Sequence, residues 1–193
     1  DTDGLTDSDQ VSFTVNGLPT APSLSISPAE PFTSDDLVAA AEGSQDPEGE
    51  TVSYVFEWWK DSVPTAHVSS TVPGADTLKG QVWTVRATPS DGLADGVAAE
   101  ASVTVQNTPP VVDSVAFGAA PHFNDSAISC TAVVSDADDG VPVHVLSLFN
   151  DTTGGLLAEA GEVQLDPALA SPGDAIRCEA VATDVDGAAA TGT

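Results

Sequence analysis

An internal repeat of about ninety residues constrains the fold of this chain more than any other feature. The stretch Ser12–Pro19 (SFTVNGLP) recurs as Ser102–Pro109 (SVTVQNTP), at an offset of 90 residues. Further along the chain, Phe32–Ala39 matches Phe123–Cys130 at an offset of 91, and Trp83–Gly92 matches Cys178–Gly187 at an offset of 95. Similarity at a fixed period identifies a tandem array of one structural unit. The chain therefore holds two successive copies, and about four residues are inserted in the middle loops of the second.

Each copy has the composition of a series of short strands. Val and Thr are frequent, and 16 Gly and 14 Pro divide the chain into short segments, which favours strands joined by turns. Strands are expected at Leu24–Ser27, Leu37–Ala41, Val52–Trp59, Val82–Thr88 and Ala101–Val105, then at Val112–Phe117, Ala127–Val134, Val143–Phe149 and Ala175–Thr183. Weaker strands are expected between Thr65 and Leu78, and between Leu156 and Leu165. A ninety-residue unit of this kind has the size of an immunoglobulin-like sandwich. The sequence predicts an all-β chain of tandem immunoglobulin-like β-sandwiches, with about 90 residues per repeat.

The repeat also predicts the domain boundaries. Residues 18–107 form the first sandwich, and residues 108–193 form the second, whose final strand is incomplete. Asp1–Gly4 resembles the hairpin Asp184–Gly187 and precedes a final-strand sequence. Residues 1–17 are therefore interpreted as the last hairpin and strand of a preceding repeat, and the chain as a window of a longer array.

Alternation within one strand predicts which side chains enter the first core. Val52, Tyr54, Phe56 and Trp58 occupy every second position and share one face of a strand. Their partners across the core are expected to be Val82 or Trp83, together with Val103 and Val105.

The two cysteines lie on strands that face each other across many immunoglobulin-like cores. Cys130 is on the second strand of the second copy, and Cys178 is on its penultimate strand. The aligned pair in the first copy, Ala39 and Trp83, sets a small residue opposite a large one. A disulfide between the sheets is predicted, which implies an oxidising, extracellular compartment. Two buried free thiols are the alternative. A metal or redox site is disfavoured because no CxxC motif is present.

Net charge excludes several classes of partner. The chain carries 30 Asp and Glu against 4 Lys and Arg, a formal charge of −26. Nucleic acids and anionic lipid surfaces are bound by dense Lys and Arg, so neither is expected as a partner. No apolar run approaches the roughly 18 to 20 residues of a membrane span, and no direct membrane insertion is expected. The natural counter-ion is a cation.

Topology predicts that acidic loops distant in sequence converge. In a sandwich of this type, the loop after the second strand and the last hairpin lie at the end that faces the preceding domain. The first acidic cluster comprises Asp46, Glu48, Glu50, Asp91 and Asp95, beside Asn16–Pro19. The second acidic cluster comprises Asp136, Asp138, Asp139, Asp184 and Asp186, beside Asn107–Pro110. Calcium takes six to eight oxygen ligands in flexible geometry, so both clusters are candidate calcium sites. Ordinary Asp-rich turns exposed to solvent are the alternative.

Four segments together carry a family resemblance. They are Tyr54–Asp61 (YVFEWWKD), Val85–Gly92 (VRATPSDG), Ala101–Val112 (ASVTVQNTPPVV) and Ser135–Gly140 (SDADDG). Their combination resembles the tandem immunoglobulin-like, cadherin-like and PKD-type repeats of large bacterial surface proteins. The resemblance implies an extracellular stalk, adhesin or filament, often stiffened by calcium. It also implies that the partners are neighbouring immunoglobulin-like repeats or identical subunits.

Signatures of catalysis are scarce, and the chain is not expected to be an enzyme. His67, His122 and His144 stand alone, without metal-ligand spacing, and no Gly-x-Ser-x-Gly motif occurs. A different function is left open by Trp59, because alternation places this side chain on the outer face of a sheet. The corresponding hypothesis is a module that binds carbohydrate or protein at the cell surface. Asn124–Ser126 and Asn150–Thr152 match the N-glycosylation acceptor pattern.

A further alternative is a fibre assembled by strand donation. Val11–Val15 has no domain of its own, while the last repeat lacks its final strand, so one subunit could complete another by β-augmentation. The Asp-x-Asp-Gly hairpin at both ends of the chain argues against this assembly, because a dedicated donor would not repeat a hairpin that its acceptor already has.

Overall fold

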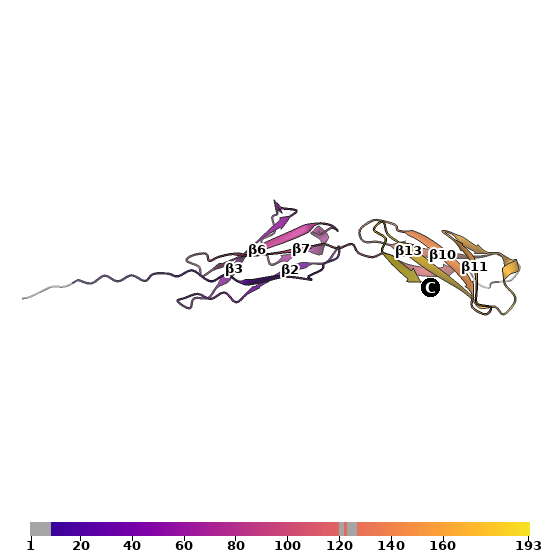
Figure 1. The fold of residues 1–193 in the computed structure, drawn as a ribbon, viewed down its shortest axis with the longest axis horizontal. Helices are drawn as coiled ribbons and strands as arrows, with labels where there is room; N and C mark the ends of the chain where they lie inside the picture. The colour runs from indigo at the N-terminus through magenta and orange to yellow at the C-terminus, as the bar shows by residue number, and fades with distance from the viewer. Residues whose placement is uncertain (1–8, 120–121, 123–126) are drawn as a thin grey trace, which may run out of the picture. The chain divides into compact units, whose positions relative to one another are not determined.

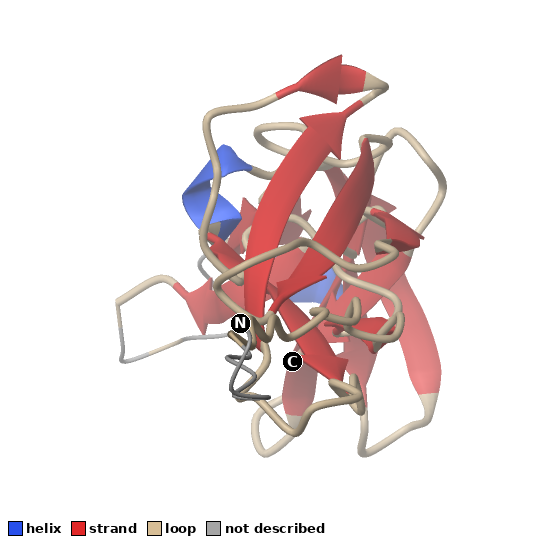
Figure 2. Cartoon of the chain, turned by 90° about the vertical axis from the view of Figure 1, so that its left-hand side faces the viewer, coloured by secondary structure: helices blue, strands red, loops and turns tan. Residues whose placement is uncertain are grey.

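The computed structural model describes residues 9–119, 122 and 127–193, and almost all of its regular structure is β (Figure 2). Apart from strands, these residues form two short 3-10 helices, Gly74–Asp76 and Pro167–Leu169. No helix among them is long and apolar enough to cross a membrane. The predicted all-β class is confirmed.

Backbone contacts group the chain into two compact units (Figure 1). The first contains the described residues up to Ala29, together with Leu37–Val72 and Val82–Val103. The second contains Glu30–Asp36, Pro73–Gln81 and Thr104–Thr193. Two segments of the first repeat's sequence therefore belong to the same compact unit as the second repeat.

The strands of the first repeat form two sheets. One has three strands in the order β1–β2–β5, and the other has four in the order β4–β3–β6–β7. The strand bounds are β1 Ser23–Ser27, β2 Leu37–Glu42, β3 Ser53–Lys60, β4 Val63–Pro64, β5 Thr71–Val72, β6 Val82–Ser90 and β7 Ala99–Thr104.

The second repeat has the same strand order. Its sheets run β12–β9–β8 and β11–β10–β13–β14. The bounds are β8 Val111–Phe117, β9 Ile128–Ser135, β10 Val143–Asn150, β11 Gly155–Ala160, β12 Val163–Leu165, β13 Ile176–Thr183 and β14 Ala189–Gly192. A three-stranded and a four-stranded sheet in this order make an immunoglobulin-like sandwich. The chain is a tandem of two such sandwiches, as the repeat predicts.

All nine of the main predicted strands are present, with ends that differ by at most two residues. The sequence missed β4 and β14. Strand β4 is two residues long and contains a proline, while β14 consists of Ala, Thr and Gly without a large apolar residue. Both are strands because a long neighbour supplies hydrogen-bond partners: β3 pairs with β4, and β13 pairs with β14. The hairpin assigned to Asp1–Gly4 lies outside the described residues.

The core of the first sandwich is built on two tryptophans. Trp58 of β3 and Trp83 of β6 are each 1% exposed, and their ring centroids lie 6.4 Å apart in edge-to-face geometry. Trp83 points inward, whereas Val82 is 42% exposed, which settles the choice between them. Alternation in β3 is confirmed, because Trp58 is buried while Val55, on the other face, is exposed. An edge-to-face aromatic pair stabilises a core by about 0.5 to 1.5 kcal/mol beyond its burial.

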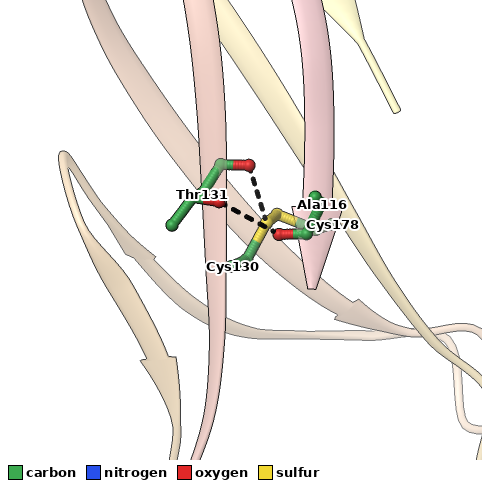
Figure 3. The surroundings of a disulfide bond; sticks show 4 residues. All are labelled: Ala116, Cys130, Thr131 and Cys178. Atoms are coloured by element: carbon green, nitrogen blue, oxygen red, sulfur yellow. Dashed lines mark hydrogen bonds between the residues drawn. A yellow bond between two sulfur atoms is a disulfide. The ribbon is translucent and has the colours of Figure 1, made fainter. Parts of the chain in front are cut away.

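The core of the second sandwich is built on the predicted disulfide. Cys130 of β9 and Cys178 of β13 are bonded, so the bridge joins the two sheets, and their Cα atoms lie 6.5 Å apart (Figure 3). Beside it, the Thr131 hydroxyl donates to the carbonyl of Ala116 on β8 (Figure 3). The bridge packs among buried Leu146, Leu148, Val163, Leu165 and Ala180. At the aligned positions of the first sandwich, Ala39 and Trp83 are both buried.

We expect removal of the disulfide to destabilise the second sandwich alone. The bridge closes a loop across a separation of 48 residues, which corresponds to about 4 kcal/mol in the chain-entropy treatment. All three tryptophans belong to the first sandwich, so tryptophan fluorescence reports on it selectively. In the Cys130→Ala/Cys178→Ala variant, the denaturant midpoint seen by circular dichroism should fall for one transition, while the fluorescence midpoint stays unchanged. An equal fall in both signals would contradict this expectation.

Candidate functional site

The loop after β2 folds around the carboxylate of Asp46. Its Oδ1 atom accepts hydrogen bonds from the backbone N–H groups of Glu48 and Gly49, at 2.9 and 3.1 Å. Its Oδ2 atom is buried and has no hydrogen-bond partner. Carboxylate oxygens of Asp46, Glu48 and Glu50 lie within 4.8 Å of one another. Three of the five residues predicted for the first acidic cluster therefore converge on one point.

The last hairpin of the first repeat is organised in the same way by Asp91. Its Oδ1 atom accepts from the N–H groups of Leu93 and Ala94, both at 2.7 Å. Its Oδ2 atom accepts from the side-chain amide of Asn16 at 2.9 Å. Asp95 pairs with Ser90 in an isolated bridge and is not part of the converging group.

The segment before β1 is attached to both loops. Besides the bond from Asn16 to Asp91, the backbone N–H of Gly17 donates to Glu48 Oε2 at 2.8 Å. A Cβ atom at Gly17 would lie 2.7 Å from Pro47 Cγ, so a side chain does not fit at this position without displacement. These two contacts, Asn16 to Asp91 and Gly17 to Glu48, are termed the first linker clamp.

The second repeat contains the same arrangement. The amide of Asn107 donates to Asp184 Oδ2 at 2.8 Å, and the N–H of Thr108 donates to Asp138 Oδ2 at 2.6 Å. These two contacts are the second linker clamp. Asp136 Oδ1 accepts from the N–H of Asp138 at 2.7 Å, as Asp46 accepts from Glu48. Its Oδ2 atom is buried without a partner, which again matches Asp46.

The two acidic clusters differ in their source of positive charge. In the second, the ammonium group of Lys79 forms ion pairs with Asp139 and Asp186. These carboxylates raise the pKa of Lys79 above its ordinary value through their hydrogen bonds to the ammonium group. In the first cluster, among the described residues, no ion pair to Asp46, Glu48 or Glu50 is present. No group of three converging acidic side chains other than Asp46, Glu48 and Glu50 occurs in the part of the chain that the structure describes.

Hydrogen bonding shifts the pKa values of three carboxyl groups. The Asn107 amide is the main cause of a lowered pKa at Asp184, whose side chain is buried. The N–H of Ala94, followed by the Asn16 amide, lowers the pKa of Asp91. A hydrogen bond with the carboxyl group of Asp46 raises the pKa of Glu50. Asp91 and Asp184 are therefore stabilised as carboxylates, whereas Glu50 holds a proton more readily.

Sequence comparison missed one equivalence within the clamps. The 90-residue offset aligns Asn16 with Gln106, but the structure shows that Asn107 makes the equivalent contact, at an offset of 91. The side chain of Gln106 instead donates to the carbonyl of Thr104. Lys79 was also missed, because no local pattern connects it with loops more than fifty residues away.

The other candidate residues are dispersed. His67 and His122 each make an edge-to-face contact with one aromatic ring, Trp83 and Phe117 respectively, and His144 lies on β10. Trp59 is half-buried, opposite Thr84 of β6.

Asn150, in one of the two predicted glycosylation sequons, is 2% exposed and donates its amide to Asp174. It is therefore not accessible for glycosylation in the folded state. The sequon Asn124–Ser126 lies outside the described residues.

Comparison with known proteins gives similarity at the level of solved structures. No model of a known protein family matches the chain, and no curated protein matches it. The FN1–FN3 domains of chicken CNTN1 match with 12% identity and a TM-score of 0.37, covering 92% of this chain and 68% of that one. A two-domain fibronectin type-III segment from chicken tenascin matches with 13% identity and a TM-score of 0.38, covering 89% and 97%. The fold of the present chain is assigned from its own strand order.

The lowered pKa of Asp184 leads to a prediction for Asn107→Ala. Ionised Asp184 stabilises the fold above its unfolded pKa, and this contribution is lost as pH falls through the lower folded pKa. Loss of the amide should raise the pKa of Asp184 and destabilise the second sandwich at neutral pH. The difference from the parent chain should shrink at acidic pH, where the carboxyl is protonated in both.

Carboxyl NMR titration combined with denaturation at several pH values tests this prediction. Asn16→Ala is the matched control, because the N–H of Ala94 contributes more than Asn16 to the pKa of Asp91. It should move the pKa of Asp91 less than Asn107→Ala moves that of Asp184. A stability difference that does not depend on pH would contradict the assignment of Asn107.

Proposed function

We propose that this chain is a structural segment of an extracellular stalk, adhesin or filament, in which the linker clamps stiffen a series of immunoglobulin-like repeats. The recurrence of the clamp carries this proposal. In both repeats an Asn side chain and the backbone N–H that follows it donate to carboxylates from two separate loops. A linker attached at two points has less freedom to bend than a linker that only connects two folds.

Two further features support an extracellular, structural role. A disulfide in the core of a sandwich is typical of proteins that fold in an oxidising compartment. The charge of −26 favours solubility and repulsion between neighbouring molecules. The segment acts by spacing and display, and its partners are adjacent repeats of the same type.

The first acidic cluster fits a calcium ion. Asp46, Glu48 and Glu50 present three oxygens within 4.8 Å, a spacing compatible with a common ion, since calcium binds oxygen at about 2.3 to 2.6 Å. The unpartnered Asp46 Oδ2 atom supplies a buried ligand that no protein donor uses. In the second acidic cluster, Lys79 already occupies the space between Asp139 and Asp186. We therefore assign calcium binding to the first cluster, where it would also hold Glu48 in place for its bond to Gly17.

Calcium should raise the stability of the first sandwich. At a free concentration about 100 times Kd, one site that binds only the folded state adds about 2.7 kcal/mol. Tryptophan fluorescence during thermal unfolding, with calcium or with a chelator, measures the effect. Glu50→Gln should abolish the shift, whereas Glu42→Gln, exposed and outside the cluster, should retain it. Equal melting temperatures with calcium and chelator would exclude the site and leave the clamp proposal standing.

The rigidity that the second linker clamp is proposed to give the linker can be tested separately from calcium binding. Nuclear relaxation of residues 106–109 should give backbone order parameters near the value of about 0.85 that characterises rigid backbone, together with one tumbling time for both sandwiches. In Asn107→Ala the order parameters should fall and the sandwiches should tumble separately. Gln106→Ala, the matched neighbour outside the clamp, should behave like the parent chain. Independent tumbling in the parent chain would overturn the stalk proposal.

A further inference from the structure

The first linker clamp is built on an Asn-Gly pair, Asn16–Gly17, which is the only such pair in the sequence. In this dipeptide the backbone nitrogen of glycine can attack the side-chain carbonyl carbon of asparagine, because glycine has no Cβ atom to obstruct the approach and its backbone is unusually free. Asparagine is counted among the thermolabile residues. The two residues that form the clamp are therefore also able to react with each other.

Packing of the linker explains why a glycine is present in the first clamp. A Cβ atom at Gly17 would lie 2.7 Å from Pro47 Cγ and 2.9 Å from Glu48 Oε2. In the second repeat, the clamp asparagine Asn107 is followed by Thr108, whose branched Cβ obstructs the same attack. Only the first clamp therefore combines the hydrogen bonds with a reactive dipeptide.

In the closed clamp, hydrogen bonds occupy the groups that would react. The amide nitrogen of Asn16 donates both of its N–H bonds, to the carbonyl of Gly17 at 2.7 Å and to Asp91 Oδ2 at 2.9 Å. The N–H of Gly17 donates to Glu48 Oε2 at 2.8 Å. Attack requires the Gly17 nitrogen to lose this proton and to bear negative charge, which the carboxylates of Glu48 and Asp91 disfavour. Reaction at Asn16 therefore requires that the clamp opens locally.

We propose that Asn16 is a modification site, at which spontaneous deamidation releases the first linker clamp. Asn16 and Gly17 are half-buried, so water reaches them once the clamp opens. The deprotonated Gly17 nitrogen then bonds to Cγ of Asn16, and the bond from Cγ to Nδ2 breaks. Ammonia leaves with the proton that Gly17 lost, and a cyclic imide remains. Water opens the imide at either carbonyl, which gives aspartate or isoaspartate at position 16.

Neither product restores both contacts of the clamp. Each carries a carboxylate where the Asn16 amide donated to Asp91, so a pair of like charges replaces a hydrogen bond. Isoaspartate also lengthens the main chain between residues 16 and 17, which displaces the N–H that Glu48 accepts. The linker thus changes once from attached to free, at a rate set by how often the clamp opens.

Peptide mass spectrometry after incubation at mildly alkaline pH measures deamidation at each asparagine. A chelator is present throughout, so that the result does not depend on the proposed calcium site. In the folded parent chain, deamidation of Asn16 should be at least about tenfold slower than in the chain denatured with guanidinium chloride, because charge-assisted hydrogen bonds must first open. In the denatured chain, Asn107 should react more slowly than Asn16. Equal rates in either comparison would overturn the proposal.

Glu48→Ala tests the protection, because it removes the acceptor of the Gly17 N–H. Deamidation of Asn16 in this folded variant should be faster than in the parent chain by at least about fivefold, for the loss of one hydrogen bond to a charged group. Glu50→Ala is the matched control, since it removes the same charge from an exposed residue of the same loop that lies outside the clamp contacts. It should change the rate by less than about twofold. Equal rates in the two variants would contradict protection by the clamp.

Asn16→Asp introduces one of the two products directly. Backbone order parameters of residues 16–18, measured by nuclear relaxation, should fall from about 0.85 toward the values below about 0.6 that characterise flexible backbone. Order parameters equal to those of the parent chain would overturn the release of the linker. Tryptophan fluorescence checks that the first sandwich is folded in each variant.

Discussion

The packing of two sheets against each other organises each sandwich. In the second sandwich the covalent bridge between Cys130 and Cys178 joins the two sheets. In the first sandwich the aligned residues Ala39 and Trp83 are both buried, and Trp83 packs edge-to-face on Trp58. Because both repeats have the same strand order, the loop after the second strand and the last hairpin lie at the same end of each sandwich.

The acidic loops come close to one another only because the two sheets of each sandwich pack together. Glu48 and Asp91 are separated by more than forty residues, yet Glu48 accepts from Gly17 and Asp91 accepts from Asn16, because the sandwich brings their loops to one end. Asp46 and Asp91 each use one oxygen for their own turn, which leaves the other for the linker or for a cation. The second cluster shows the alternative to a metal ion, since the ammonium group of Lys79 lies between Asp139 and Asp186. The loops of the second repeat thus hold a protein cation, and a calcium ion is the proposed counterpart in the first.

The sequence by itself determined the all-β class, the tandem sandwiches, nine strands and the cysteine pair. These features follow from local alternation and from the repeat, which report which positions are buried. It also pointed to the loop in which Asp46, Glu48 and Glu50 converge. Only the tertiary structure decided that Asn107 rather than Gln106 makes the clamp, that Asp95 lies outside the first cluster and that Lys79 enters the second. The short strands β4 and β14 likewise depend on a neighbouring strand. Asn107 and Lys79 are held by partners more than fifty residues away, and no local pattern records the position of such a partner. Strands β4 and β14 pair with strands that are adjacent in sequence, but their own residue types do not signal a strand.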